Sequence, residues 1–120
     1  VVFATMIDLL AKIKSSFERH GADATENEIM RLYKTADLLI IDDIGKEQPT
    51  EWALAKIYQI INARYEDYKP MIITSNYTAD ELVRRMTPAS GDPTTADATV
   101  DRILEMTYTV PLAGESWRTK

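Results

Sequence analysis

Short apolar runs alternate with amphipathic segments along the chain. The clearest run, Leu38–Ile41, contains no polar residue, which is typical of a strand buried on both faces of a parallel sheet. Comparable patterns predict further strands over residues 1–4, 71–74 and 106–112. Between the strands, apolar residues recur at helical spacing and predict helices over residues 6–20, 26–34, 51–67, 79–86 and 100–104. This alternation predicts an α/β fold, built on a parallel sheet with right-handed crossovers.

Capping residues precede several of the predicted helices. Thr5 and Thr50 stand where N-caps are expected, and Thr25 and Thr78 each have a glutamate three residues later, as in a capping box. The stretch from Thr87 to Ala98 is instead rich in Pro, Gly, Ser, Thr, Asp and Ala. Such a composition predicts an exposed, flexible loop.

Polar residues directly follow two of the predicted strands. Asp42 and Asp43 come after the central run, and Ser75 and Asn76 come after the strand at 71–74. Ligands of parallel sheets bind beyond the carboxyl ends of the strands, where neighbouring ends lie side by side. A bare pair of carboxylates there costs free energy unless a cation or a reaction uses it. The pattern suits a Walker B segment, whose first acid holds Mg²⁺ and whose second orients the attacking water; a simple turn after a core strand is the alternative.

Composition narrows the classes of function. The 120 residues suit one domain, and the absence of cysteine excludes disulfides and thiolate metal sites and fits the cytoplasm. A single histidine, His20, argues against a histidine-based metal site. No run reaches transmembrane length, and no signal peptide is recognisable at the start. The net charge of −5 argues against a nucleic-acid interface over the whole surface. Arg64, Arg84 and Arg85 are interpreted as solvated helix charges, of which the last two can contribute to a local DNA-facing patch.

Several segments together carry a resemblance to a known family. They are residues 38–45, 62–65, 69–76, 81–82, 101–103 and 114–118. In this order and spacing they resemble the AAA+ ATPase domain of the DnaC/DnaI-type helicase loaders, to which the IstB-like transposition ATPases are related. The resemblance covers most of the chain. It implies a P-loop NTPase fold, with a parallel sheet in a three-layer α/β/α arrangement.

The resemblance implies a role for each matching polar residue. Asp42 matches the Walker B acid that binds Mg²⁺, Asp43 matches the catalytic acid, and Asn76 matches sensor 1, which senses the nucleotide. Arg102 matches the arginine finger that acts on the nucleotide of a neighbouring subunit. Arg118 matches sensor 2, which contacts phosphate. Without the resemblance, both arginines would be interpreted as solvated charges.

One motif of that family is missing. No Gly-x-x-x-x-Gly-Lys-Ser/Thr sequence occurs, although this Walker A loop supplies the amides and the lysine that cradle the phosphates. In the family, the loop and the first strand of the sheet precede the segment that begins at Val1. The family's strand order, 5-1-4-3-2, would place the absent strand between residues 71–74 and 106–112. Residues 1–120 are therefore expected to form a single partial AAA+ domain, from Walker B to sensor 2, with unpaired strand edges that favour association.

The function implied by the resemblance is that of a loader that delivers the replicative helicase to single-stranded DNA. Its cofactors would be ATP or ADP and Mg²⁺, and copies would associate through the ATPase interface. ATP hydrolysis would belong to the complete protein, and this chain alone is expected to be inactive. The alternatives are an IstB-like transposition ATPase and a non-catalytic interaction module derived from an ATPase. A phosphoacceptor receiver domain would need a further strand-end Asp and a later strand-end Lys, which the sequence lacks.

Overall fold

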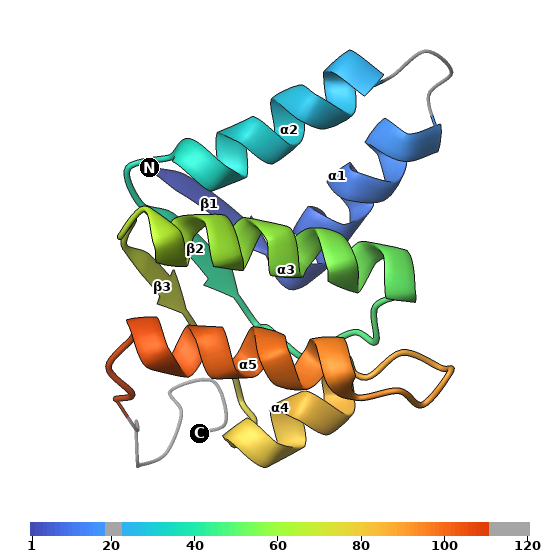
Figure 1. The fold of residues 1–120 in the computed structure, drawn as a ribbon, viewed down its shortest axis with the longest axis vertical. Helices are drawn as coiled ribbons and strands as arrows, with labels where there is room; N and C mark the ends of the chain where they lie inside the picture. The colour runs from blue at the N-terminus through green and yellow to red at the C-terminus, as the bar shows by residue number, and fades with distance from the viewer. Residues whose placement is uncertain (19–22, 111–120) are drawn as a thin grey trace, which may run out of the picture.

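The computed structural model describes residues 1–18 and 23–110. The elements within them are, in chain order, β1 (Val2–Thr5), α1 (Met6–Glu18), α2 (Asp23–Thr35), β2 (Leu39–Asp42), α3 (Glu51–Glu66), β3 (Met71–Ile73), α4 (Ala79–Met86) and α5 (Thr94–Met106). The strands form a parallel sheet in the order β1-β2-β3 (Figure 1). The predicted α/β fold with a parallel sheet is confirmed, and this order agrees with the 4-3-2 part of the order that the resemblance implies.

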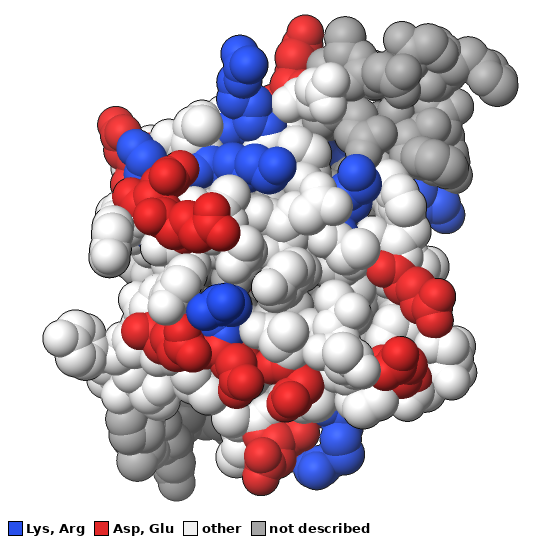
Figure 2. Space-filling view, in the orientation of Figure 1, with Lys and Arg blue, Asp and Glu red and all other residues white. Residues whose placement is uncertain are grey.

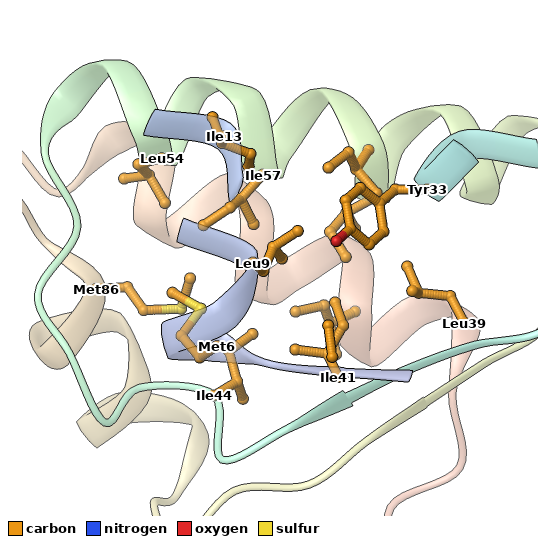
Figure 3. Packing of buried hydrophobic residues seen from close by; sticks show 14 of the residues in the cluster. Met6, Leu9, Ile13, Tyr33, Leu39, Ile41, Ile44, Leu54, Ile57 and Met86 are labelled. Atoms are coloured by element: carbon orange, nitrogen blue, oxygen red, sulfur yellow. The ribbon is translucent and has the colours of Figure 1, made fainter. Parts of the chain in front are cut away.

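One face of the sheet forms the core. The strand register brings Ala4, Ile41 and Ile73 into one row across the sheet. Ala4 and Ile41 are buried, and Leu9 of α1 and Ile57 of α3 belong to the same buried cluster (Figure 3). Burying an aliphatic side chain of this size stabilises a fold by about 1.5 to 3 kcal/mol. The helices are therefore held against the sheet by their apolar stripes, as their spacing predicted.

The opposite face of the sheet is open over the described residues. Its central row consists of Phe3, Ile40 and Ile72, which lie side by side in the register. The side chain of Phe3 is 62% exposed and that of Ile72 is 49% exposed. The prediction that the Leu38–Ile41 run is buried on both faces is thus wrong for the described part of the chain. The second helical layer of the expected α/β/α arrangement is not among these residues.

Three of the predicted N-caps are confirmed. The Asp8 amide donates to the Thr5 hydroxyl at 3.1 Å, and the Ala53 amide donates to the Thr50 hydroxyl at 3.1 Å. At α4, the Thr78 hydroxyl accepts from the Glu81 amide at 3.3 Å and donates to the Glu81 carboxylate at 2.9 Å. The capping box predicted at Thr25 is wrong, because α2 already begins at Asp23.

The carboxyl-terminal part of the chain differs most from the prediction. Helix α5 begins at Thr94, so residues 94–98 of the loop predicted from Thr87 to Ala98 are helical. Ala96, Val100 and Ile103 are buried at helical spacing, and this apolar stripe outweighs the loop-like composition. Met106 ends α5, and residues 107–110 form no strand, so the strand predicted over 106–112 is wrong as far as the structure describes it. Residues 111 and 112 lie outside the described residues.

Arg64 is predicted to be a solvated charge, and this prediction is wrong. The residue is fully buried in α3. Its guanidinium donates to the carbonyls of Tyr33 at 2.9 Å, Ala36 at 2.8 Å and Pro70 at 2.6 Å. Burial lowers the pKa of Arg64 from its usual value. The three carbonyls belong to the end of α2 and to the segments that lead into β2 and β3, so one side chain ties these segments together.

Candidate functional site

The two predicted acids lie where β2 ends. Asp42 is the last residue of the strand and is half-buried, and Asp43 follows it with a φ of 58°. A residue other than glycine in this left-handed region costs about 1 kcal/mol or more, and such strain persists only where neighbouring contacts hold it. The contacts that hold Asp43 come from the end of β3.

One hydroxyl connects the two acids. The Asp43 amide donates to Thr74 Oγ1 at 2.9 Å, and Thr74 Oγ1 in turn donates to Asp42 Oδ1. Thr74 follows β3, the strand paired with β2. The carboxyl ends of the two strands therefore meet at one edge of the sheet, as the sequence predicted.

Backbone contacts continue this pairing beyond the strands. The Thr74 amide donates to the Ile41 carbonyl at 3.0 Å, and the Ile44 amide donates to the Thr74 carbonyl at 2.9 Å. The Ser75 hydroxyl donates to the Ile44 carbonyl at 2.9 Å. The position of the acid pair is thus fixed by main-chain bonds as well as by the Thr74 side chain.

Helix α4 packs against the loop that follows Asp42 and Asp43. Gly45 has a φ of 92°, and a Cβ atom there would lie 2.6 Å from Leu82 Cδ1 of α4. The Arg85 guanidinium donates to the Gly45 carbonyl at 3.1 Å and lies 4.7 Å from the centre of the Tyr77 ring. Arg85 is therefore engaged with its own chain rather than being only a solvated charge.

Asn76, the residue predicted as sensor 1, lies two residues beyond Thr74 and is exposed. The Tyr77 amide donates to the Ser75 hydroxyl at 3.1 Å, which shapes the turn that carries Asn76. The structure thus brings the acids and the amide to the same edge of the sheet.

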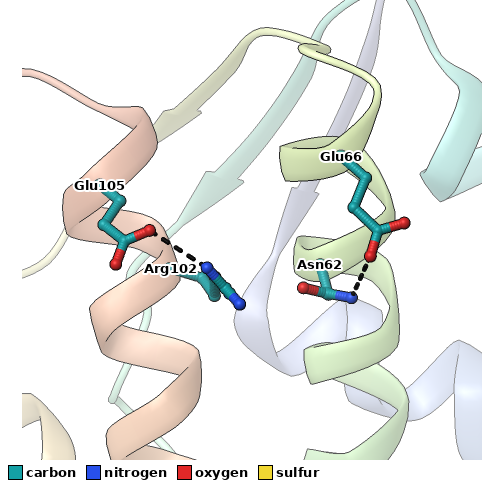
Figure 4. Close-up of polar contacts among 4 residues, drawn as sticks. All are labelled: Asn62, Glu66, Arg102 and Glu105. Atoms are coloured by element: carbon teal, nitrogen blue, oxygen red, sulfur yellow. Dashed lines mark hydrogen bonds and ion pairs between the residues drawn. The ribbon is translucent and has the colours of Figure 1, made fainter.

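Arg102 lies on α5 and its guanidinium faces α3 (Figure 4). Its guanidinium is 3.2 Å from Glu105 Oε2 and 4.5 Å from the centre of the Tyr65 ring. A hydrogen bond with Tyr58 and the charge of Glu105 raise the pKa of Arg102. Tyr65 belongs to the last turn of α3, which leads toward the start of β3, so Arg102 lies toward the amino ends of the strands. Within one chain it does not join the acids, and Arg118 lies outside the described residues.

The acid pair suits Mg²⁺ better than a metal held by protein ligands alone. Over the described residues, no group of three or more His, Cys, Asp and Glu side chains could hold a metal ion. Mg²⁺ is usually held by one or two carboxylates, with water and phosphate oxygens completing its coordination. The carboxylates of Asp42 and Asp43 fit that pattern.

Two hollows of the described surface have volumes of about 400 Å³ and 180 Å³, and neither is lined by Asp42 or Asp43. The larger one lies at the carboxyl-terminal ends of α3 and α5. Exposed acids also recur every fourth residue along α5, at Asp97, Asp101 and Glu105, and acidic side chains mark this part of the surface in Figure 2. That face of α5 is unsuited to contact with the phosphate backbone of a nucleic acid.

Comparison with known proteins identifies the family. The sequence profile of the IstB-like ATP binding proteins matches residues 1–120. The chain belongs to this family.

Relatives of this IstB-like chain include a replicative helicase loader, a protein of a phage-like element and a protein of an insertion sequence. The replicative helicase loader DnaI of Bacillus subtilis is 26% identical over 97% of the chain and 39% of its own length. The PBSX phage-like element protein XkdC of the same species is 32% identical over 70% of the chain and 31% of its own length. A putative ATP-binding protein of insertion sequence IS5376, from Geobacillus stearothermophilus, is 29% identical over 97% of the chain and 43% of its own length.

The chain thus spans well under half the length of these relatives. A solved structure, a DNA replication initiation factor, superposes with a TM-score of 0.62 over 82% of the chain and 27% of its own, at 20% sequence identity. This likeness shows a shared fold, and it agrees with the α/β architecture and parallel sheet of the chain. Over the described residues, no helix is both long enough and apolar enough to span a bilayer.

Two residues of the site of this IstB-like chain are not predicted from the sequence. The sequence predicts Thr74 as the last residue of a strand but predicts no hydrogen bond for it. A hydroxyl at a strand end, beside an acid pair, is nevertheless a signal for such a bond. The sequence indicates only a solvated charge at Arg85, and its contact becomes visible once α4 is placed against the loop at Gly45. Nothing in the local sequence predicts that contact, which joins residues 40 positions apart.

Proposed function

We propose that the chain is the Walker B and sensor part of an ATPase of the helicase-loader type. The observation that carries the proposal is the Thr74-linked pair of Asp42 and Asp43 at the carboxyl edge of a parallel sheet, in a chain of the IstB-like family. In this role the Asp42 carboxylate holds Mg²⁺, directly or through water. The Asp43 carboxylate orients the water that attacks the γ-phosphate, and the Asn76 amide senses that phosphate. Mg²⁺ bound with ATP would supply charge neutralisation at the phosphates.

The other parts of the proposed ATP site would come from residues that lie away from Asp42 and Asp43. The sequence has no Walker A loop, so the phosphate cradle would come from chain beyond these 120 residues. Arg102, which lies away from the acids of its own chain, would act on the nucleotide of a neighbouring subunit after leaving Glu105 and Tyr65. Arg118 would contact phosphate as sensor 2. This arrangement requires self-association through the ATPase interface.

The biological role proposed for the whole protein is to bind a replicative helicase and deliver it to single-stranded DNA. The match to the replicative helicase loader DnaI over nearly the whole chain supports it. Transposition is the second candidate, supported by the insertion-sequence protein, which matches an equal share of the chain. Retention of a purified replicative helicase by the immobilised whole protein would favour the loader. Retention of a transposase, with no helicase bound, would favour transposition.

Calorimetric titration with a slowly hydrolysed ATP analogue and Mg²⁺ tests the nucleotide site. We expect micromolar binding by the whole protein, at least tenfold weaker in Asp42→Asn, and no binding by the 120-residue chain, which lacks a phosphate cradle. Asp37→Asn is the matched control, because Asp37 is an exposed acid at the opposite end of β2. Absence of binding by the whole protein would favour a non-catalytic interaction module. Tight binding by the 120-residue chain would show that another backbone segment cradles the phosphates.

A further inference from the structure

We propose that Thr74 is a positioning residue for the acid pair, and that its hydroxyl fixes how Asp42 and Asp43 meet the metal ion. The inference rests on the proposed function, since the metal and the nucleotide belong to it. Thr74 acts through the two acids and does not itself contact metal or substrate. No motif assigns this role to Thr74; it follows from the contacts of one side chain.

The direction of the hydrogen bonds supports this role. A hydroxyl has one proton to donate, and it can accept through its lone pairs. The Asp43 amide can only donate, so at Thr74 Oγ1 it uses an acceptor site and leaves the hydroxyl proton for Asp42 Oδ1. The hydroxyl therefore donates to one oxygen of Asp42, and its bond at Oδ1 sets the direction in which Oδ2 faces. Oxygen partners that orient metal-binding carboxylates in this way tune the affinity for the metal.

The same hydroxyl constrains Asp43 through its main chain. Asp43 has a φ of 58°, a conformation that needs support from its neighbours. Its amide bond to Thr74 Oγ1 supplies part of that support at 2.9 Å. Loss of the hydroxyl would free the Asp43 peptide to turn, and its carboxylate would turn with it. A substitution at Thr74 thus displaces both carboxylates, although neither aspartate is itself substituted.

The surrounding main-chain bonds allow this role to be tested without loss of the fold. The Thr74 amide and carbonyl bind the Ile41 carbonyl and the Ile44 amide, and these bonds do not involve the side chain. Thr74 is exposed, so valine at this position leaves no buried cavity. Thr74→Val removes the hydroxyl at nearly constant volume, whereas Thr74→Ser keeps it. Thr35→Val is the matched control, because the exposed Thr35 hydroxyl donates to the Arg31 carbonyl of its own helix, α2, which precedes β2.

The experiment is a Mn²⁺ titration of the whole protein in the presence of the slowly hydrolysed ATP analogue. Electron paramagnetic resonance measures the free Mn²⁺ at each step. We expect Mn²⁺ affinity about tenfold or more weaker in Thr74→Val and within about threefold of wild type in Thr74→Ser and Thr35→Val. In steady-state hydrolysis, Thr74→Val should lower kcat and raise the Mg²⁺ concentration for half-maximal rate, with little change in the KM for ATP. Thermal unfolding of each variant checks the fold.

The outcomes separate this inference from the proposed function. Wild-type affinity for Mn²⁺ in Thr74→Val, or equal losses in Thr74→Ser and Thr74→Val, would overturn the positioning role while nucleotide binding by the wild type still stands. Failure of the wild-type protein to bind either the analogue or Mn²⁺ would overturn both. Weak binding by Thr74→Val that is restored by serine supports both.

Discussion

Arg64 lies fully buried in α3, where its guanidinium takes the place of water as donor to three main-chain carbonyls. A buried carbonyl that loses its donor retains the whole cost of desolvation. Those carbonyls stand where α2 ends and where the chain enters β2 and β3, so the arginine stabilises the junction of three segments.

Replacement of Arg64 by methionine should therefore destabilise the chain strongly. The variant keeps much of the buried volume but leaves the carbonyls of Tyr33, Ala36 and Pro70 without this donor. We expect the free energy of unfolding to fall by about 3 kcal/mol or more, as measured by urea denaturation. Arg84→Met, at an exposed position of α4, should change it by less than about 0.5 kcal/mol. Equal stabilities of the two variants would show that water replaces the guanidinium at no cost.

Single residues also show which parts of the site can be predicted from the sequence. The acids and Asn76 lie at the strand ends as predicted, because a buried apolar run followed by polar residues is a strong signal for the carboxyl end of a strand. The roles of Arg64 and Thr74 are not predictable in this way, because their partners are 28 to 32 positions away or are main-chain atoms of other segments. A long-range hydrogen bond leaves no periodic pattern in the sequence. The position of the Thr74 hydroxyl at a strand end signals a contact, but it does not identify the partners.

At the scale of elements, the acid-bearing loop and α4 are packed so closely that they form one unit. Gly45 lies against Leu82 and Tyr77, and the Arg85 guanidinium donates to its carbonyl. The Gln48 side chain also donates to the Thr87 carbonyl at the end of α4, at 2.9 Å. A displacement of α4 would therefore reach the loop that follows Asp43.

Two glycines of similar conformation allow the packing to be separated from backbone strain. Gly45 has a φ of 92° and Gly91 a φ of 87°, but a Cβ atom at Gly91 would meet nothing within 4 Å. Gly91→Ala should cost about 1 kcal/mol of unfolding free energy for the left-handed backbone. Gly45→Ala should cost about 1 to 3 kcal/mol more, because its methyl group meets Leu82 Cδ1.

Urea denaturation of both variants measures this difference, and a double-mutant cycle with Leu82→Ala identifies its origin. If the contact with Leu82 is responsible, Gly45→Ala should cost less in the Leu82→Ala background than in the wild type. Equal costs at Gly45 and Gly91 would mean that the loop moves away from α4 freely.

Elements are predicted well where periodicity and caps agree, and poorly where composition opposes periodicity. Thr50 and Thr78 cap α3 and α4 as expected. The first turns of α5 contain Thr, Ala and Asp, which favour a loop by composition, yet its apolar stripe is buried against α3 and α4. Tertiary packing decides this segment, and a local prediction does not include it.

At the scale of the whole molecule, the main feature is a parallel sheet with helices packed on one face over the described residues. Parallel sheets in proteins are almost always covered on both faces. Here the open row contains Phe3, Ile40 and Ile72, and β3 has no further strand paired with it among the described residues. An exposed apolar row beside an unpaired strand edge favours association with another chain.

The 120-residue chain alone should therefore self-associate through this face. Phe3→Thr combined with Ile72→Thr removes the two most exposed apolar side chains of the row and keeps residues that suit strands. Sedimentation velocity should show a lower average mass for this double variant, and binding of a hydrophobic dye should decrease. Leu32→Thr with Leu104→Thr is the matched control, since these side chains are 49% and 45% exposed but lie singly on α2 and α5. The control should associate like the wild type, because scattered apolar residues form no continuous surface. Association that persists in the strand variant and disappears in the helix variant would place the contact on the helical side of the molecule instead.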